Sequence, residues 1–415
     1  MNTVISNADP IANENKDVSE YKAQRHLVPY SKVDCEGNEK KYVCEVIDSG
    51  WLTTASKTLE LEEKFKQMLG VSHAIAVNSC TAALHLALEA TGVEANQKIF
   101  CPTMTFTASA EVIRYVGCHP VLLDVDPTTY SLNREILLQA IKDNPDVKHM
   151  IGVHYGGRAL DMRNSAETGI ADICDQHGIT LIEDAAHALP ARQGEGMVGN
   201  LGKIACFSFY ANKTMTTGEG GMVVTNDEEL ARRIRLMRLH GIDRDVWDRF
   251  TRPGASWEYD VLAPGFKYNM PDLCAAVGLA QFERLFEMRD SRELCARYYY
   301  EHLSALKGLE LPSKPENFGD HAWHLFPVCI SSDVKISRNA FKDRLEAAGV
   351  GTSVHYKPVH RLTYYKENYS LSTSDYPGAE KIWRSTFSLP IYNKLTHKDL
   401  VHVVTSIKSL LATCS

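Results

Sequence analysis

Short apolar segments alternate with helical stretches over about residues 48–265 of the chain. The apolar segments begin near residues 73, 98, 120, 148, 179, 203 and 221, and a helix is expected from Thr81 to Gly92. Strands that recur with helices between them favour an open, mostly parallel α/β sheet. Ligands of such sheets bind at the carboxyl ends of the strands.

The pattern changes after about residue 266. It predicts a long helix over 272–306, a strand over 324–330, a helix opened by Ser337 and a strand over 352–358. A last helix follows Thr396, where Thr-His-Lys-Asp is typical of a capping box. We therefore expect a large α/β domain over 26–265 and a smaller α+β domain over 266–415. Residues 1–25 are polar without periodicity and predict an arm that carries no chemistry.

The composition points to a small-molecule partner. The 415 residues are 44% hydrophobic and 23% charged, with a formal net charge of −7 and no basic run, which argues against nucleic acid. Eleven cysteines are scattered without metal spacing, which predicts free thiols in a reducing compartment and no metal site. Since the sequence has neither a signal peptide nor an apolar stretch of membrane length, we expect a cytoplasmic protein without membrane contact.

Lys213 stands between an apolar segment and a glycine-rich turn that ends at Gly221. Burial lowers the pKa of a lysine, and the neutral amine is the nucleophile that Schiff-base formation with an aldehyde requires. The alternative is a surface lysine after an edge strand. The motif around Asp184, upstream of the lysine, favours the Schiff-base interpretation.

Asp184 and His187 follow the apolar segment 179–183, about thirty residues before the lysine. A carboxylate opposite a pyridine nitrogen keeps that nitrogen protonated, so that the ring can accept electrons. Asp184 is placed for this role. His187 is expected near the phenolic oxygen or the ring of such a cofactor, and a structural histidine at a helix start is an equal alternative.

Ser79, Cys80 and Thr81 lie where a strand turns into a helix. Free backbone N–H groups and hydroxyls at such a turn suit a phosphate. Taken alone, Ser79 and Thr81 are more often plain N-caps, but their order before Asp184 and the lysine favours phosphate binding. Phe106 offers an aromatic face to a pyridine ring, although a core position is the default for a single phenylalanine.

Six ordered motifs carry a resemblance to a known family: Gly50-Trp-Leu-Thr-Thr54, Asn78-Ser-Cys-Thr-Ala-Ala-Leu84, Pro102-Thr-Met-Thr-Phe106, Glu183-Asp-Ala-Ala-His187, Phe207 to Gly221, and Gly265-Phe-Lys-Tyr-Asn269-Met. From about Val28 onward the chain resembles the DegT/DnrJ/StrS-type sugar-nucleotide aminotransferases. These are fold-type I enzymes that use pyridoxal 5′-phosphate. The resemblance implies a large domain with a mostly parallel sheet flanked by helices, and a smaller α+β C-terminal domain.

The same resemblance implies roles for individual residues. Lys213 would bind the cofactor covalently and act as general acid and base, and Asp184 would hold the pyridine nitrogen. Ser208, with Cys80 and Thr81, would bind the phosphate, and Phe106 would stack on the ring. Asn269 would reach the phosphate of a neighbouring subunit, which implies a homodimer with shared active sites.

Two departures from the family pattern affect detail. Phe106 stands where some relatives have tryptophan, and Tyr210-Ala-Asn212 replaces a histidine-containing run. A branch of the family that dehydrates sugars has histidine in place of Lys213, so the lysine favours transamination. A sugar dehydratase, a desulfurase and a regulatory relative without turnover remain the rival interpretations.

The resemblance implies L-glutamate as the amino donor and a nucleotide-linked keto-sugar as the acceptor. Segment 240–260 is similar to that of relatives acting on UDP-linked 4-keto sugars, with dTDP or GDP as alternatives. Its Trp247 and Arg249 suit a base and a diphosphate. A dimer-interface loop is an equal alternative. Thr54, His324 and His355 are the other expected substrate residues, and each has a structural role as its alternative.

Overall fold

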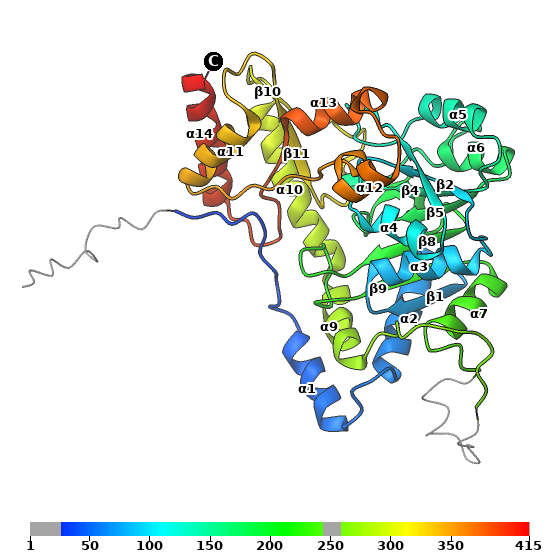
Figure 1. Cartoon of the computed structure of the whole chain (residues 1–415). Helices are drawn as coiled ribbons and strands as arrows, with labels where there is room; N and C mark the ends of the chain where they lie inside the picture. Colours follow the sequence, from blue (N-terminus) through cyan, green and yellow to red (C-terminus); the bar gives the residue numbers. More distant parts are fainter. Residues whose placement is uncertain (1–25, 244–258, 415) are drawn as a thin grey trace, which may run out of the picture.

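The computed structural model describes residues 26–243 and 259–414, and its centre is a seven-stranded sheet of order β1-β9-β8-β5-β4-β2-β3 (Figure 1). Only β9 runs antiparallel to its neighbours, so the prediction of a mostly parallel sheet is confirmed. The strands are β1 His73–Val77, β2 Lys98–Pro102, β3 His119–Leu123, β4 His149–Val153, β5 Thr180–Asp184, β8 Ile204–Ser208 and β9 Gly221–Thr225.

Helices cover both faces of this sheet, because the strands are apolar on both sides. Alternate residues of β8 separate accordingly: Ile204 and Cys206 belong to one core cluster, Ala205 and Phe207 to another. The helices against the first face are α3 Cys80–Ala90, α4 Ala108–Tyr115 and α7 Glu228–Met237. Those against the second face are α2 Ser56–Leu69, α5 Arg134–Asp143, α6 Ile170–Gln176 and α9 Asp272–Glu283.

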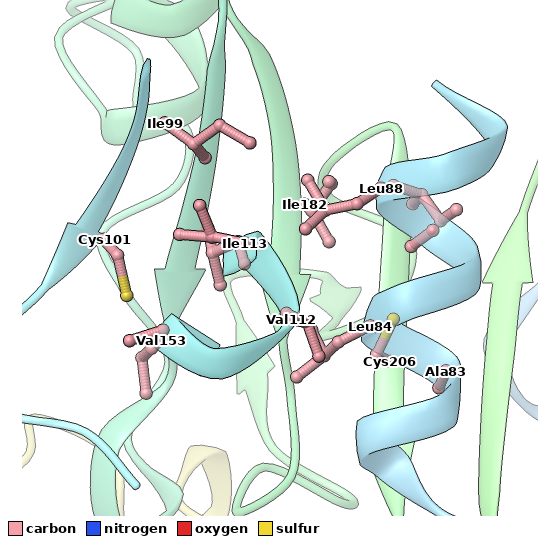
Figure 2. Close-up of a cluster of buried hydrophobic side chains, with 14 of the residues drawn as sticks. Ala83, Leu84, Leu88, Ile99, Cys101, Val112, Ile113, Val153, Ile182 and Cys206 are labelled. Carbon is pink, nitrogen blue, oxygen red and sulfur yellow. The ribbon is translucent and has the colours of Figure 1, made fainter. Parts of the chain in front are cut away.

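Helix α3 is buried on nearly every side, since it lies between the sheet and its neighbouring helices. Figure 2 shows Leu84 and Leu88 of this helix beside Ile182 of β5, with Val112 and Ile113 of α4 closing the cluster. These five side chains are at most 1% exposed. The packing fixes the start of α3 at the carboxyl edge of the sheet.

A smaller antiparallel sheet, of order β10-β11-β12, lies beside the large one (Figure 1). Its strands are β10 Leu309–Glu310, β11 Phe326–Ile330 and β12 Thr386–Leu389. Helices α10 Leu285–Leu303, α11 Arg338–Ala347 and α14 His397–Cys414 share its hydrophobic core. The remaining elements are α1 Glu39–Ser49, α12 Thr363–Asn368, α13 Pro377–Ser385, a two-stranded sheet of β6 Arg192–Gln193 and β7 Gly196–Met197, and four short 3₁₀ turns.

Two predicted helix starts are confirmed. The Ser337 hydroxyl accepts a hydrogen bond from Ala340 N at 3.2 Å and caps α11. At the start of α14, Thr396 Oγ1 accepts from Asp399 N, and Asp399 accepts from Thr396 N, which is the reciprocal pattern of a capping box. The first turns of both helices were therefore readable from the sequence.

Two other predictions were wrong. The long helix over 272–306 is two helices, α9 and α10, which meet at Arg284 because α9 packs on α1 and α2 while α10 packs in the small core. Residues 352–358 form no strand. Only Ser353 bridges to β12, and the carbonyl of His355 accepts a hydrogen bond from the Tyr155 hydroxyl instead of entering a ladder.

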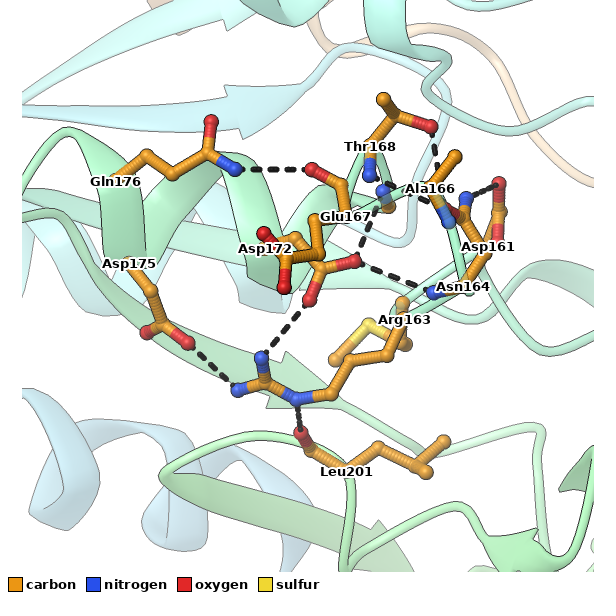
Figure 3. Close-up of polar contacts among 12 residues, drawn as sticks. Asp161, Arg163, Asn164, Ala166, Glu167, Thr168, Asp172, Asp175, Gln176 and Leu201 are labelled. Atoms are coloured by element: carbon orange, nitrogen blue, oxygen red, sulfur yellow. Dashed lines mark hydrogen bonds and ion pairs between the residues drawn. The ribbon is translucent and has the colours of Figure 1, made fainter.

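The connection leading into β5 is fixed by polar contacts (Figure 3). The Asp172 carboxylate accepts hydrogen bonds from Gly169 N and Asn164 N, and Arg163 pairs with Asp172 while donating to Leu201 O. A Cβ added at Gly169 would lie 2.3 Å from Met162 O, so only glycine fits there. The loop is therefore fixed to the start of α6 Ile170–Gln176, the helix that precedes β5.

Two negative observations concern only the described residues. Over 26–243 and 259–414, no helix is both long and apolar enough to cross a membrane. In that same part of the chain, histidine, cysteine, aspartate and glutamate side chains form no group of three that suits a metal ion.

One buried ion pair ties α2, β1 and the end of α7 together. Arg238 Nη1 lies 2.6 Å from Glu62 Oε1 and also donates to Ala76 O, while Ala76 N donates to the same carboxylate. Both side chains are at most 8% exposed.

Replacing Arg238 by methionine should lower the free energy of unfolding by about 3–5 kcal/mol, because an unpaired carboxylate would remain buried. Chemical denaturation measures this, and adding Glu62→Gln should recover part of the loss. The control is Arg232→Met, which removes the exposed pair with Glu229 and should leave stability unchanged. Equal losses for the two methionine variants would contradict the assignment.

Candidate active site

A cavity of about 480 Å³ opens at the carboxyl ends of β4, β5 and β8, with the segment 355–356 of the small domain on its far side. This is the edge at which the parallel sheet was expected to hold a ligand. The lining residues are Cys80, Thr81, Leu84, Thr105, Phe106, Ala108, Val153, His154, Tyr155, Asp184, Ala186, His187, Tyr210, Asn212, Lys213, Glu219, His355 and Tyr356.

Lys213 lies in the turn after β8, and its amine lies beside the ring of His324. Nζ is 3.5 Å from Nε2 of His324. Burial lowers the pKa of Lys213 to about 8, with Arg292 acting in the same direction, and Cys80 and Asp184 oppose the change. A pKa of about 8 leaves part of the amine neutral near physiological pH, and this neutral part can act as the nucleophile.

Asp184 ends β5 and its carboxylate is held at both oxygens. The Ser109 hydroxyl donates to Oδ2 at 2.6 Å, and Ala186 N donates to Oδ1 at 3.1 Å. Thr105 Oγ1 lies 2.8 Å from Ser109 Oγ, so Thr105 is the donor of that bond. These donors fix the position of the carboxylate at the wall of the cavity.

His187 is neutral, and its tautomer follows from its partners. Gly156 N donates to Nδ1 at 3.2 Å, so the proton is on Nε2, which lies 3.0 Å from the Tyr356 hydroxyl. Burial, and next Lys213, hold the pKa of His187 well below its usual value. The ring of His324 lies 4.4 Å from that of His187, and burial depresses the pKa of His324 in the same way.

Two buried atoms at this wall have no hydrogen-bond partner among the described residues: His324 Nδ1 and Asn212 Oδ1. Asn212 lines the cavity directly. His355 differs, because its Nδ1 lies 2.9 Å from the Ser388 hydroxyl, and burial lowers its pKa to about 4. Unpartnered polar atoms beside a cavity indicate that a polar ligand completes the site.

The start of α3 forms another wall. Ser79 Oγ accepts from Ala82 N at 3.1 Å and so caps the helix, while Cys80 and Thr81 line the cavity. Gly221 approaches this turn so closely that an added Cβ would lie 2.8 Å from Cys80 N. Ser208 is 9% exposed and accepts from Tyr210 N at 3.3 Å, just outside the lining.

Phe106 lines the cavity with a ring that is 55% exposed and 5.7 Å from that of Tyr356. Asn269 and Thr54 do not line it. They bond to each other at 2.6 Å through Asn269 Nδ2 and Thr54 Oγ1. Trp247 and Arg249 lie outside the described residues.

Sequence reasoning did not single out Ser109, Asn212 or Tyr356. Asn212 is adjacent to the lysine and Tyr356 to His355, so sequence proximity was an available signal for both. Ser109 lies three residues after Phe106, in the first turn of α4, but its bond to Asp184 spans 75 residues. The sequence contains no local sign of that contact.

A buried lysine with a lowered pKa and a hydrogen-bonded carboxylate line one cavity at the carboxyl edge of a mostly parallel sheet. This arrangement is typical of an enzyme that uses an aldehyde cofactor with a basic ring nitrogen. The comparisons with known proteins agree with this class. A sequence model described as the DegT/DnrJ/EryC1/StrS aminotransferase family matches residues 33–408. The chain belongs to this family, and pyridoxal phosphate is its cofactor.

Three relatives illustrate the similarity. The "Uncharacterized protein MJ1066" of Methanocaldococcus jannaschii is 40% identical over 382 residues, covering 91% of this chain and 96% of that protein. The spore coat polysaccharide biosynthesis protein SpsC of Bacillus subtilis is 37% identical over 393 residues, covering 94% and 98%. Among solved structures, the putative sugar aminotransferase Spr1654 of Streptococcus pneumoniae in its PMP form has a TM-score of 0.84 at 28% identity, covering 94% and 98%. The same enzyme is also solved in its PLP form.

The depressed pKa of Lys213 gives a pH dependence. Capture of pyridoxal phosphate by the apoprotein should accelerate with rising pH and level off above about pH 8, because the neutral amine is then the dominant form. Stopped-flow absorbance measures the rate, with Lys213→Ala as the variant that lacks the amine. A rate that keeps rising to the pKa of an exposed lysine, about 10.4, would contradict the burial of the amine.

Proposed function

We propose that this protein transfers an amino group from L-glutamate to a nucleotide-linked keto-sugar, giving an amino-sugar nucleotide for glycan or polysaccharide biosynthesis. The observation that carries the proposal is the neutral Lys213 amine in one cavity with the fixed Asp184 carboxylate. The sugar is supported by the names of two relatives, a putative sugar aminotransferase and a polysaccharide biosynthesis protein. UDP is the preferred nucleotide, and a 4-keto sugar the preferred acceptor.

The residues present suit the proposed chemistry. When bound, pyridoxal phosphate supplies an aldehyde carbon for the amine and a ring that accepts electrons. Lys213 binds that carbon and later, as a free amine, carries the proton from the donor α-carbon and returns one to the sugar carbon. Asp184, held by Ser109 and Ala186, keeps the ring nitrogen protonated.

We assign the remaining cavity walls to the cofactor. Cys80 and Thr81 at the start of α3, with Ser79 and Ser208 beside them, hold the phosphate, because a helix N-terminus of this length favours an anion. Phe106, which lines the cavity, would stack on the ring. His187, whose proton is on Nε2, would donate a hydrogen bond to the phenolic oxygen.

The sugar is assigned to the opposite wall. His355 lines the cavity, and its Nδ1 is bonded to Ser388, which leaves Nε2 for a sugar hydroxyl. His324 lies next to Lys213, and its Nδ1 has no partner among the described residues. Burial keeps both rings neutral, because it lowers their pKa values. Trp247 and Arg249 are assigned to the nucleotide on composition alone. Thr54 is the remaining assigned residue; it lies outside the cavity of its own chain and would act in the site of a second subunit.

We propose a homodimer with shared active sites on the basis of Thr54 and Asn269. Their side chains bond to each other and lie outside the cavity of their own chain. Asn269 would then reach the phosphate bound by a neighbouring subunit, with Thr54 beside it. Each site would be complete only in the dimer.

The deciding measurement is the visible spectrum of the purified protein before and after addition of L-glutamate. The band of the lysine-bound cofactor should bleach in the wild type, with release of 2-oxoglutarate, while Lys213→Ala should show no such change. A panel of UDP-, dTDP- and GDP-linked keto-sugars should then restore the band for the true acceptor.

Each other outcome has a defined meaning. Bleaching without any restoring sugar would reject the acceptor class. Cofactor binding without bleaching by glutamate or another amino acid would support a regulatory relative, and loss of a sugar hydroxyl without 2-oxoglutarate would support a dehydratase.

The shared site is tested by mixing subunits. Lys213→Ala and Asn269→Asp homodimers should each be inactive, and co-expression should restore activity, since one site of the hybrid then has both a lysine and an asparagine. If the site lies within one chain, the hybrid would stay as inactive as its parents. Size-exclusion chromatography with light scattering establishes that the variants are dimers.

A further inference from the structure

Arg292 of α10 is a buried arginine without a carboxylate partner among the described residues. It is 3% exposed. Its guanidinium donates to Ile391 O at 2.9 Å, to Asn393 Oδ1 at 3.1 Å and to Trp323 O at 3.5 Å. All three acceptors are neutral, so its charge is hydrogen-bonded and remains uncompensated. Arg238, which is equally buried, meets the carboxylate of Glu62 instead.

The position of this charge relates it to the active site. Trp323, whose carbonyl accepts from Arg292, is the residue before His324, and His324 Nε2 lies 3.5 Å from Lys213 Nζ. The guanidinium is therefore bonded to the backbone next to His324, and its charge lowers the pKa of the ring that contacts the catalytic amine. Burial lowers the pKa of Arg292 to about 10, which leaves it charged at neutral pH.

The other groups around the amine do not replace this charge. Asp184 of β5 acts in the opposite direction, and burial holds the pKa of the Cys80 thiol well above its usual value, so that thiol is neutral. His187, His324 and His355 are also neutral, since burial depresses their pKa values. Beside Arg292 itself, Tyr30 and Cys295 are uncharged because burial raises the pKa of each.

We propose that Arg292 is a positioning residue whose fixed positive charge, on a guanidinium bonded to the backbone next to His324, keeps the Lys213 amine in the uncharged form that reacts with an aldehyde. A nearby cation disfavours a second positive charge, and few neighbours here can screen it. Because Asp184 is required on the ring nitrogen, its attraction for a protonated lysine has to be offset. Burial is the largest cause of the lowered pKa of Lys213, and Arg292 adds to it against the attraction of Asp184 without touching the cofactor. The inference rests on the proposed role of Lys213 as the residue that binds the cofactor, and it concerns what sets the pKa of this amine.

The test uses competitive labelling of the apoprotein with acetic anhydride across pH, with mass spectrometry of the Lys213 peptide. This method reports the pKa of the amine without cofactor, donor or sugar. In the wild type we expect a midpoint near 8, and in Arg292→Met a midpoint higher by roughly one unit. Arg292→Lys keeps the charge and should stay near the wild-type midpoint. Thermal unfolding of all three shows whether the fold is retained.

The two variants separate charge from structure. Lysine and methionine both lose the planar fork that binds Ile391 O and Asn393, so a merely structural role would change them alike. An unchanged midpoint in a folded Arg292→Met protein would overturn the proposal. If that variant does not fold, Arg292→Gln retains part of the hydrogen bonding and must show the same upward shift. Failure of the sugar or glutamate assignments would leave these midpoints unaffected.

Discussion

The active site depends on keeping an amine uncharged within reach of a carboxylate that must stay charged. Lys213 and Asp184 line one cavity, and in water both would be ionised and paired. Burial disfavours both charges, so the structure has to treat the two groups differently. Asp184 receives hydrogen bonds from Ser109 and Ala186, whereas the lysine amine lies 3.5 Å from the neutral imidazole of His324.

The fold explains how two groups so far apart in the chain reach this arrangement. Parallel strands β5 and β8 are neighbours, and their carboxyl ends deliver Asp184 and, after a short turn, Lys213 to the same edge. Helix α3 crosses beneath both strands, and its burial fixes where its first turn opens. The antiparallel strand β9 then returns the chain against that turn, where Gly221 leaves space for backbone contact.

The features that could be predicted from the sequence are those marked by residues close together in the chain. Apolar segments bounded by turns identified the strands, and Ser337 and Thr396 identified helix starts, because these signals lie within a few residues. The roles of Lys213 and Asp184 followed from strand ends plus a family resemblance. The region 352–358 was misread as a strand because its composition suits one, while its backbone in fact bonds to the side chain of Tyr155. Ser109 and Arg292 act through partners far along the chain, and no periodicity marks such contacts.

Arg292 also shows that the small domain contributes a charge to the active site in addition to covering it. The large domain alone provides the amine, the carboxylate and a helix N-terminus, all from one sheet edge. Its Asp184 carboxylate favours the protonated and unreactive amine. The opposing charge comes from α10, and it is fixed by the carbonyl groups of Trp323, just before β11, and Ile391, just after β12, at one end of the small sheet. The pKa of Lys213 therefore depends on the packing of the small domain. A change in that packing would alter the reactivity of the amine through the position of the charge as well as through the shape of the cavity.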